Sequence, residues 1–348
     1  MRGLGISAHG GLDQVGWVEI PPPEPGPGEV RVRVRAAAFN RLDRFMVQGI
    51  PGVPVEFPHV LGSDGAGVVD RLGEGVTDLA TGAEVLVNPG LWDGTCEYCQ
   101  RGQESLCRNF RILGEHTQGS ATQFIVMPRR NLYPKPPMWS WPQAAAAPLV
   151  FETAWRALKS IGQVRPGETV AVIGAGGAVA PAAIQVARQL GGRVVVVGRS
   201  RPKVDRALQL GAEAGLVITA EKPHDKLLWE WSNKRGIDVI FDSVGAETVP
   251  RSLRALARGG RVVVVGATEG GQVELDLRTL FWRQGSIRGS TMSSRSEFEE
   301  VYAELRQGHL QPVVDSEWEF DRGVDAFRRL GEPDVFGKVV LRTPAPEA

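Results

Sequence analysis

The pattern of apolar and polar positions divides the chain into a β-rich first part and an alternating second part. Three valines alternate with arginines over residues 30–34, which predicts a half-exposed strand. Short apolar runs at 66–69 and 84–87, separated by glycine turns, predict further strands. The proline-rich segment 21–27 predicts an extended connection. The first 135 or so residues are therefore expected to be rich in β-structure.

After residue 167 the pattern changes to short apolar runs separated by helical periodicity. Strands are expected at 169–173, 194–198, 215–219, 237–241, 261–265 and 286–289. Strands that alternate with helices predict a parallel, doubly wound sheet. The tail predicts a short helix near 298–305 and a final strand at 338–341.

Length and composition limit the classes of protein to consider. A chain of 348 residues, 42% of them hydrophobic, is expected to form about two globular domains. Its 40 basic and 40 acidic side chains cancel, which argues against a nucleic-acid or membrane partner held by bulk charge. We find no apolar run long enough for a membrane span and no apolar signal core near the start. Three clustered cysteines indicate a reducing, cytoplasmic compartment.

The segment 169–201 has the layout of a dinucleotide-binding βαβ unit. An apolar strand leads into a turn with glycines at Gly174, Gly176 and Gly177, and a helical pattern and a second apolar strand follow. A pyrophosphate needs bare backbone and free N–H groups at such a turn. Val179 stands where a third glycine is usual. The alternative is a glycine-rich turn that binds no nucleotide.

The end of the second strand of this unit favours NADPH over NADH. An NAD-preferring site places a carboxylate there, whereas this chain has Arg199, Ser200 and Arg201, with Lys203 shortly after. Cationic side chains would pair with a 2′-phosphate, which a carboxylate would repel. The alternative is an ordinary solvated basic loop.

The spacing Asp93-x-x-Cys96-x-x-Cys99-x7-Cys107 predicts one zinc ion. Three thiols and a carboxylate can complete a tetrahedron around zinc, and a site with four protein ligands is structural because no position is open to substrate. The alternatives are free buried cysteines and a remnant site that has lost its metal.

Several segments together resemble the medium-chain dehydrogenase/reductase superfamily. They are Pro23–Val30, Val34–Asp43, Pro58–Val69, Pro89–Cys107, the turn at 174–179, and Gly259–Gly266. The resemblance implies an α/β protein with a GroES-like β-rich catalytic domain at 1–147 and 292–348, zinc-binding loop 89–107 included. It implies a Rossmann domain, a doubly wound parallel sheet, at 148–291. It also places Asp242, Gly245 and Gly266 beside the cofactor.

The chain departs from the alcohol dehydrogenase branch of this superfamily at the catalytic metal. Where that branch has a Cys-His pair, this chain has Asn40 and Arg41. The GHEGAG segment of that branch corresponds to Gly62–Gly67 in this chain. The third ligand of the catalytic zinc, which lies later in the sequence of that branch, corresponds to a position near Val150 and Phe151 in this chain. Without thiol or imidazole ligands, no catalytic zinc is expected to activate an alcohol. The Asn-x-x-Asp pattern starting at Asn40 resembles the quinone oxidoreductase branch.

The expected function is NADPH-dependent reduction of a quinone or an α,β-unsaturated carbonyl compound, a small-molecule substrate. Asn40 and Arg41 are expected to donate hydrogen bonds to the carbonyl oxygen, and the proton is expected from water or His116. One alternative is a zinc alcohol dehydrogenase with altered ligands and two zinc ions. The other is a nucleotide-binding structural protein with no catalysis.

The strand expected at Ser286–Ser290 ends the Rossmann sheet, and a free sheet edge tends to pair. In the resembling family this edge often meets its symmetry mate, and a two-fold contact closes at two subunits. The sequence therefore favours a homodimer. The alternative is an edge that Ser286, Arg288 and Ser290 keep solvated.

Overall fold

The computed structural model describes residues 1–344, which form two compact units. The first unit contains residues 1–149, 294–298 and 312–344, and the second contains 150–293 and 299–311. This division differs from the expected domain bounds in that residues 148–149 lie in the first unit, and residues 292–293 and 299–311 lie in the second. Glu300 accepts hydrogen bonds from Trp155 Nε1 and Lys159 Nζ, both at 2.9 Å, which tie this stretch to the second unit.

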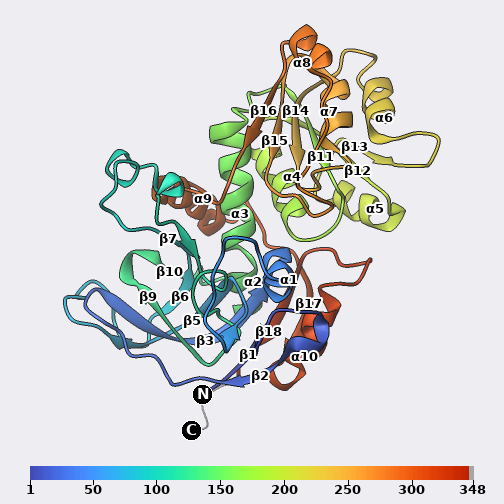
Figure 1. The fold of residues 1–348 in the computed structure, drawn as a ribbon. Coiled ribbons are helices and arrows are strands. Elements are labelled where there is room, and N and C mark those ends of the chain that lie inside the picture. Colours follow the sequence, from blue (N-terminus) through green and yellow to red (C-terminus); the bar gives the residue numbers. More distant parts are fainter. Residues whose placement is uncertain (345–348) are drawn as a thin grey trace. The chain divides into compact units, whose positions relative to one another are not determined.

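The first unit is built mainly from antiparallel strands (Figure 1). Its main sheet has the order β10-β6-β5-β3-β18-β17, and β9 also pairs with β3. These strands are β3 (Glu29–Phe39), β5 (Asp64–Leu72), β6 (Glu84–Val87), β9 (Phe124–Pro128), β10 (Leu132–Pro134), β17 (Val314–Glu319) and β18 (Lys338–Arg342). The smaller sheets contain β1 (Arg2–Ile6), β2 (Val15–Glu19) and β4 (His59–Val60), and β7 (Gly90–Leu91) with β8 (Arg111–Ile112).

Strand β3 confirms the alternating pattern of the sequence in its first half. Val30, Val32 and Val34 are buried, and the arginines between them are half-buried. From Ala36 to Phe39 every side chain is buried, because β5 and β18 flank the strand and core residues cover both faces. The helices of this unit are α1 (Arg41–Gln48), α2 (Trp141–Ala146) and α10 (Gly323–Arg329). The end of β3 therefore leads from the buried core directly into α1.

The second unit contains the predicted doubly wound sheet, with the order β13-β12-β11-β14-β15-β16 and parallel neighbours throughout (Figure 1). Its strands are β11 (Thr169–Ile173), β12 (Arg193–Gly198), β13 (Ala214–Val217), β14 (Ile237–Asp242), β15 (Leu256–Val264) and β16 (Ser286–Gly289). Its helices are α4 (Val179–Gln189), α5 (Arg201–Gln209), α6 (His224–Trp231), α7 (Val249–Ala255) and α8 (Leu277–Arg283). Two helices cross the unit boundary: α3 (Pro148–Trp155) and α9 (Arg295–Gln307).

Strands β11 and β12 of this sheet are apolar after their first residues, Thr169 and Arg193. Val170 to Ile173 and Val194 to Val197 are at most 1% exposed. Continuous burial of this kind is expected where helices cover both faces of a parallel sheet. No helix of the described chain is both long and apolar enough to cross a membrane.

Candidate cofactor, metal and substrate sites

The glycine turn after β11 lies at the carboxyl end of the parallel sheet, as do the loops after β12, β14 and β15. Gly174 and Gly177 have φ angles of +92° and +72°, which residues other than glycine rarely adopt. A Cβ atom at Gly176 would lie 2.6 Å from Lys203 Nζ. The turn therefore presents bare backbone, with an ammonium group beside it.

The basic loop after β12 is exposed, and its arginines have carboxylate partners. Arg199 Nη2 contacts Glu247 Oε2 at 2.6 Å, and Arg201 Nε contacts Asp205 Oδ1 at 2.9 Å. Ser200 precedes the first residue of α5 as its N-cap. A guanidinium has five N–H donors, so each arginine retains donors for a further anion. Of the four predicted residues, Lys203 is the one that the structure brings against the glycine turn.

Asp242 shapes the loop after β14. Its Oδ1 accepts hydrogen bonds from the N–H groups of Val244 and Gly245, at 2.8 and 3.0 Å, and from Thr248 Oγ1 at 2.9 Å. Burial raises the pKa of this carboxyl, and these donors oppose the rise. The carboxyl therefore holds the loop, and its contact with a cofactor stays a prediction.

Gly245 and Gly266 let the loops after β14 and β15 pack closely. Gly245 has a φ of +97°, and a Cβ there would lie 2.6 Å from the carbonyl oxygen of Gly270. A Cβ at Gly266 would approach the oxygen of Ser243 to 3.2 Å. The close packing of these loops is therefore sufficient to explain both glycines without a bound cofactor.

The four predicted metal ligands converge. The ligand atoms of Asp93, Cys96, Cys99 and Cys107 all lie within 4.8 Å of one another. The sulfur atoms of Cys96 and Cys99 are 3.6 Å apart, near the separation of about 3.8 Å expected for a tetrahedron with Zn–S bonds of about 2.3 Å. The donor set fits zinc.

Hydrogen bonds orient the Asp93 carboxylate for this role. Oδ1 accepts from the N–H groups of Thr95 and Cys96, and Oδ2 accepts from Asn109 Nδ2 at 2.9 Å. The N–H of Cys99 is the main cause that lowers the pKa of the Cys96 thiol to about 7. Burial raises the pKa of Cys99 to about 12, so its thiolate requires a nearby cation. Bound zinc would supply that charge.

In the first unit, Asn40 belongs to a buried polar cluster with Asp64 and Lys338. Lys338 Nζ donates to Asn40 Oδ1 and to Asp64 Oδ2, both at 2.6 Å, and Asn40 Nδ2 donates to Asp64 Oδ2 at 2.9 Å. The side chains of Lys338 and Asp64 are 1% and 0% exposed. We refer to these three residues as the Asn40 cluster.

Strand register brings the Asn40 cluster together. Val339 pairs with Phe39 in the antiparallel β18/β3 ladder, which places Lys338 opposite Asn40. Asp64 pairs with Ala38, two residues before Asn40. Because side chains alternate between the two faces of a strand, all three side chains lie on one face.

The hydrogen bonds leave one donor of Asn40 available. An amide has two N–H donors and one oxygen. Lys338 occupies the oxygen, and Asp64 accepts one N–H. Among the described residues, none accepts the second side-chain N–H of Asn40. Asn40 as a residue is 6% exposed. Asp43 holds the backbone of this turn, since its carboxyl accepts the N–H groups of Asn40 and Gly62 at 2.7 and 2.6 Å.

The other two predicted catalytic residues are placed differently. Arg41 is the exposed first residue of α1. His116 is half-buried, and its Nδ1 accepts the N–H of Ile112 at 3.2 Å, which assigns the proton of the neutral ring to Nε2. Burial lowers the pKa of this imidazole. The structure therefore places Arg41 at the exposed start of α1, directly after Asn40, and within the described residues it shows no hydrogen bond from the His116 side chain to the Asn40 cluster.

Sequence reasoning missed Lys338, Asp64 and Glu115 as functional candidates. A lysine at the start of an apolar strand, directly after Gly337, was a signal for a buried charge. Asp64 corresponds to the glutamate of the GHEGAG segment, and this correspondence by itself predicts no hydrogen-bonding partner for it. Glu115 is 9% exposed, and its pKa is raised to about 7, mainly by burial and then by the Asp43 charge. No local pattern marks Glu115.

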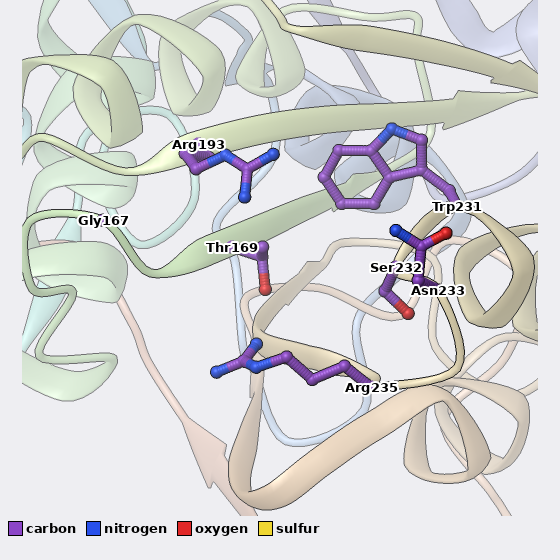
Figure 2. Close-up of a pocket in the computed structure, with 7 residues that line it drawn as sticks. All are labelled: Gly167, Thr169, Arg193, Trp231, Ser232, Asn233 and Arg235. Atoms are coloured by element: carbon purple, nitrogen blue, oxygen red, sulfur yellow. The ribbon is translucent and has the colours of Figure 1, made fainter.

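A separate pocket of about 310 Å³ lies in the second unit, at the amino ends of β11 and β12 (Figure 2). Thr169, Arg193, Trp231 and Arg235 are among its lining residues. Arg193 is paired with Glu213 and Arg235 with Asp238. The glycine turn lies at the opposite, carboxyl end of the same strands, so this pocket does not belong to the predicted cofactor site.

Two family models match the chain. The model described as alcohol dehydrogenase GroES-like domain matches residues 26–137. The model described as zinc-binding dehydrogenase matches residues 178–307. The two matches fall mainly in the first and the second unit, respectively.

Curated relatives match over most of this chain. Acryloyl-coenzyme A reductase of Metallosphaera sedula is 32% identical over 290 residues, which is 83% of this chain and 85% of that protein. Polyketide synthase GfsB of Streptomyces halstedii is 33% identical over 82% of this chain. The matched part is only 5% of the length of that synthase.

Solved structures match over nearly the whole chain. One, an NAD-dependent alcohol dehydrogenase, is 41% identical with a TM-score of 0.92, and the match covers 99% of this chain and 100% of that one. A cobalt- and zinc-bound thermostable alcohol dehydrogenase from Pyrobaculum aerophilum is 34% identical with a TM-score of 0.88, and covers 98% and 99%.

Proposed function

The chain belongs to the medium-chain dehydrogenase/reductase superfamily of NAD(P)-dependent oxidoreductases, and we propose that it uses NADPH to reduce the activated double bond of an α,β-unsaturated carbonyl compound or a quinone. The observation that carries the proposal is the Asn40 cluster. It holds one amide N–H ready to donate, at the position where the alcohol dehydrogenase branch has a metal-binding cysteine.

The charges around Asn40 disfavour a catalytic metal at this place. The ammonium of Lys338 already binds Asp64 Oδ2 and the Asn40 oxygen, so it would repel a cation, and the other Asp64 oxygen, Oδ1, accepts the N–H of Leu149 at 2.9 Å. Within residues 1–344, the one group of three or more converging His, Cys, Asp or Glu side chains is the Asp93 site. These facts support hydrogen-bond catalysis.

Hydride addition to the β-carbon places negative charge on the carbonyl oxygen. A donor that is already oriented stabilises this charge without reorganisation, and removal of one such donor typically costs about 10²–10³-fold in kcat. Lys338 and Asp64 orient the Asn40 amide, and Asp43 holds its backbone. We assign Asn40 the role of oxyanion donor and Arg41 an auxiliary role at the exposed side.

The second unit would hold the cofactor. NADPH would place its pyrophosphate on the turn at Gly174–Gly177 and its 2′-phosphate near Arg199, Ser200, Arg201 and Lys203. A zinc ion at the Asp93 site would have a structural role, because all four positions are protein ligands. Three neighbouring thiols suit a reducing compartment, so we infer a cytoplasmic location. From the sheet edge at β16 we infer a homodimer.

One alternative has an observation in its favour. The 41% identity to an NAD-dependent alcohol dehydrogenase keeps alcohol oxidation open as a second activity. That reaction would need a metal or another group to lower the pKa of the alcohol.

An assay with both reaction classes tests the proposal. NADPH oxidation is followed with a panel of enones, enoyl thioesters and quinones, and NAD(P)⁺ reduction with a panel of alcohols. We expect turnover of the first panel, and a loss of kcat of about 10²-fold or more for Asn40→Ala. Alcohol oxidation that disappears with a second, removable zinc ion would instead favour the alternative.

A further inference from the structure

Glu115 lies beside the segment that contributes Asp64 to the Asn40 cluster. Residues 119–121 run along residues 60–62, with backbone hydrogen bonds of 2.8 Å from the N–H of Gly119 to the oxygen of Val60 and from the N–H of Ser120 to the oxygen of Gly62. A Cβ atom at Gly114 would approach the Gly62 oxygen to 2.5 Å. This close approach seats Glu115 against the 60–64 segment, where Asp43 also holds the N–H of Gly62.

The Glu115 carboxyl is nearly buried and lacks hydrogen-bond donors. Its side chain is 12% exposed, and its contact with His116 Nδ1 is 3.9 Å long. Among the described residues, no group donates a hydrogen bond to this carboxyl. A buried carboxylate without donors is costly, so the neutral acid is favoured.

His116 is a poorer proton donor in this arrangement. Its Nδ1 accepts a backbone N–H, and burial together with the charge of Arg111 lowers the pKa of the ring, so it carries only the Nε2 proton near neutral pH. A neutral imidazole gives up its N–H proton far less readily than a carboxylic acid does.

We propose that Glu115, as a carboxylic acid, donates the proton that completes the reduction. The inference rests on the function proposed above. Bound NADPH would supply the hydride for the C–H bond at the β-carbon, and the π electrons would move onto the carbonyl oxygen to give an enolate. The O–H bond of Glu115 then breaks as its proton forms the C–H bond at the α-carbon. NADP⁺ and the carboxylate remain, and a proton from water restores the acid.

The groups around Glu115 suit this role. Burial and the negative charge of Asp43 both raise its pKa, to about 7, which lies near the working pH of a general acid. The pKa of Asp43 is itself raised to about 6, mainly by burial. The other titratable groups on this side are His59, whose Nε2 lies 3.0 Å from the Gly114 oxygen, His116, and Arg111, whose charge acts on His116. Activity should therefore fall as the pH rises through about 7, because Glu115 then loses its proton.

The test uses α-methyl enones and α-methyl enoyl thioesters, because protonation of their α-carbon creates a stereocentre. For the unmodified protein we expect one product enantiomer. For Glu115→Gln we expect a kcat at least about 10²-fold lower, no titration near pH 7, and mixed stereochemistry at the α-carbon. Hydride delivery to the β-carbon should stay stereospecific, as NADPH labelled with deuterium would report.

Two further variants make the outcome unambiguous. Glu332→Gln is the same change at an exposed residue and should alter none of these readings. His116→Gln should keep a single enantiomer. Retention of rate, pH profile and stereochemistry in Glu115→Gln would overturn the assignment, as would their loss in His116→Gln alone. If the unmodified protein reduces none of these substrates, the proposed function is wrong, and the assignment of Glu115 as proton donor is wrong with it.

Discussion

Lys338 is the side chain on which the geometry of the Asn40 cluster depends most. Its side chain is 1% exposed, and its ammonium has two partners at 2.6 Å. Burial of an ion pair is expensive, and removal of one partner leaves the other charge uncompensated. The pair is therefore expected to act as an orienting device for Asn40 more than as a source of net stability.

The first prediction concerns Lys338→Met. The change leaves Asp64 buried without its cation, so the free energy of unfolding should fall by about 3–5 kcal/mol. Urea unfolding measures this. The control is Arg322→Met, which breaks an exposed pair with Asp325 and should cost less than about 1 kcal/mol. Equal losses for the two variants would show that the buried pair is not formed.

The second prediction concerns cofactor choice at Arg199 and Arg201. Changing both to Asp should weaken NADPH binding by about 100-fold or more, because hydrogen bonds to charged groups contribute about 1.5–3 kcal/mol each. Affinity for NADH should change little. Calorimetry with both cofactors measures this, with Arg206→Asp on the same helix as control. Equal affinity of the unmodified protein for NADH and NADPH would contradict a 2′-phosphate site.

At the scale of elements, the loop 93–107 has little regular structure of its own. It contains two single-turn helices, Cys99–Arg101 and Glu104–Leu106, and few of its side chains are buried. Such a loop cannot rely on a hydrophobic core, so bound zinc would supply much of its folding free energy.

The third prediction is that Cys99→Ser releases one zinc ion per chain and lowers Tm, while hydride transfer persists in the folded fraction. Elemental analysis and calorimetry measure these. Glu97→Gln, an exposed carboxylate of the same loop outside the ligand set, should keep the metal. Two zinc ions per chain, or catalysis lost on mild chelation of a folded protein, would point to the alcohol dehydrogenase alternative.

At the scale of the whole molecule, the three most exposed large apolar side chains of the described residues lie near the edge of the parallel sheet. Leu277, Phe281 and Trp282 of α8 are 65%, 64% and 69% exposed, and β16 follows directly in sequence. Ser290 donates its N–H to Val264, so by alternation the N–H of Ile287 points to the open edge. The Arg288 guanidinium donates a hydrogen bond to the backbone oxygen of Ile161, so it is not positioned to block strand pairing at the edge.

The fourth prediction is that this edge joins two copies of the chain. Ile287→Pro removes an outward donor while leaving the bonds to β15, and should weaken the dimer. Sedimentation at micromolar concentration measures this, with Ile287→Val as control. A single species near 37.6 kDa for the unmodified protein would show that the edge stays unpaired.

The sequence alone was sufficient for features whose signals are local. The strands β11 and β12 were predictable because a sheet covered on both faces demands continuous apolar runs. The metal ligands lie within 15 residues, so their spacing alone predicted the convergence now seen. Gly174 and Gly177 of the turn were predictable because their left-handed backbone conformation disfavours other residues.

Tertiary structure decided the features that depend on distant pairing. Lys338 meets Asn40 across 298 residues, and no local pattern shows which buried charge faces which amide. That meeting depends on the register of β18 against β3, since a shift of one residue would turn Lys338 to the other face. The raised pKa of Glu115 likewise depends on burial and on Asp43, 72 positions earlier in the sequence. Residue types and spacing suggested the chemistry, whereas the choice of donor and acid required the packed fold.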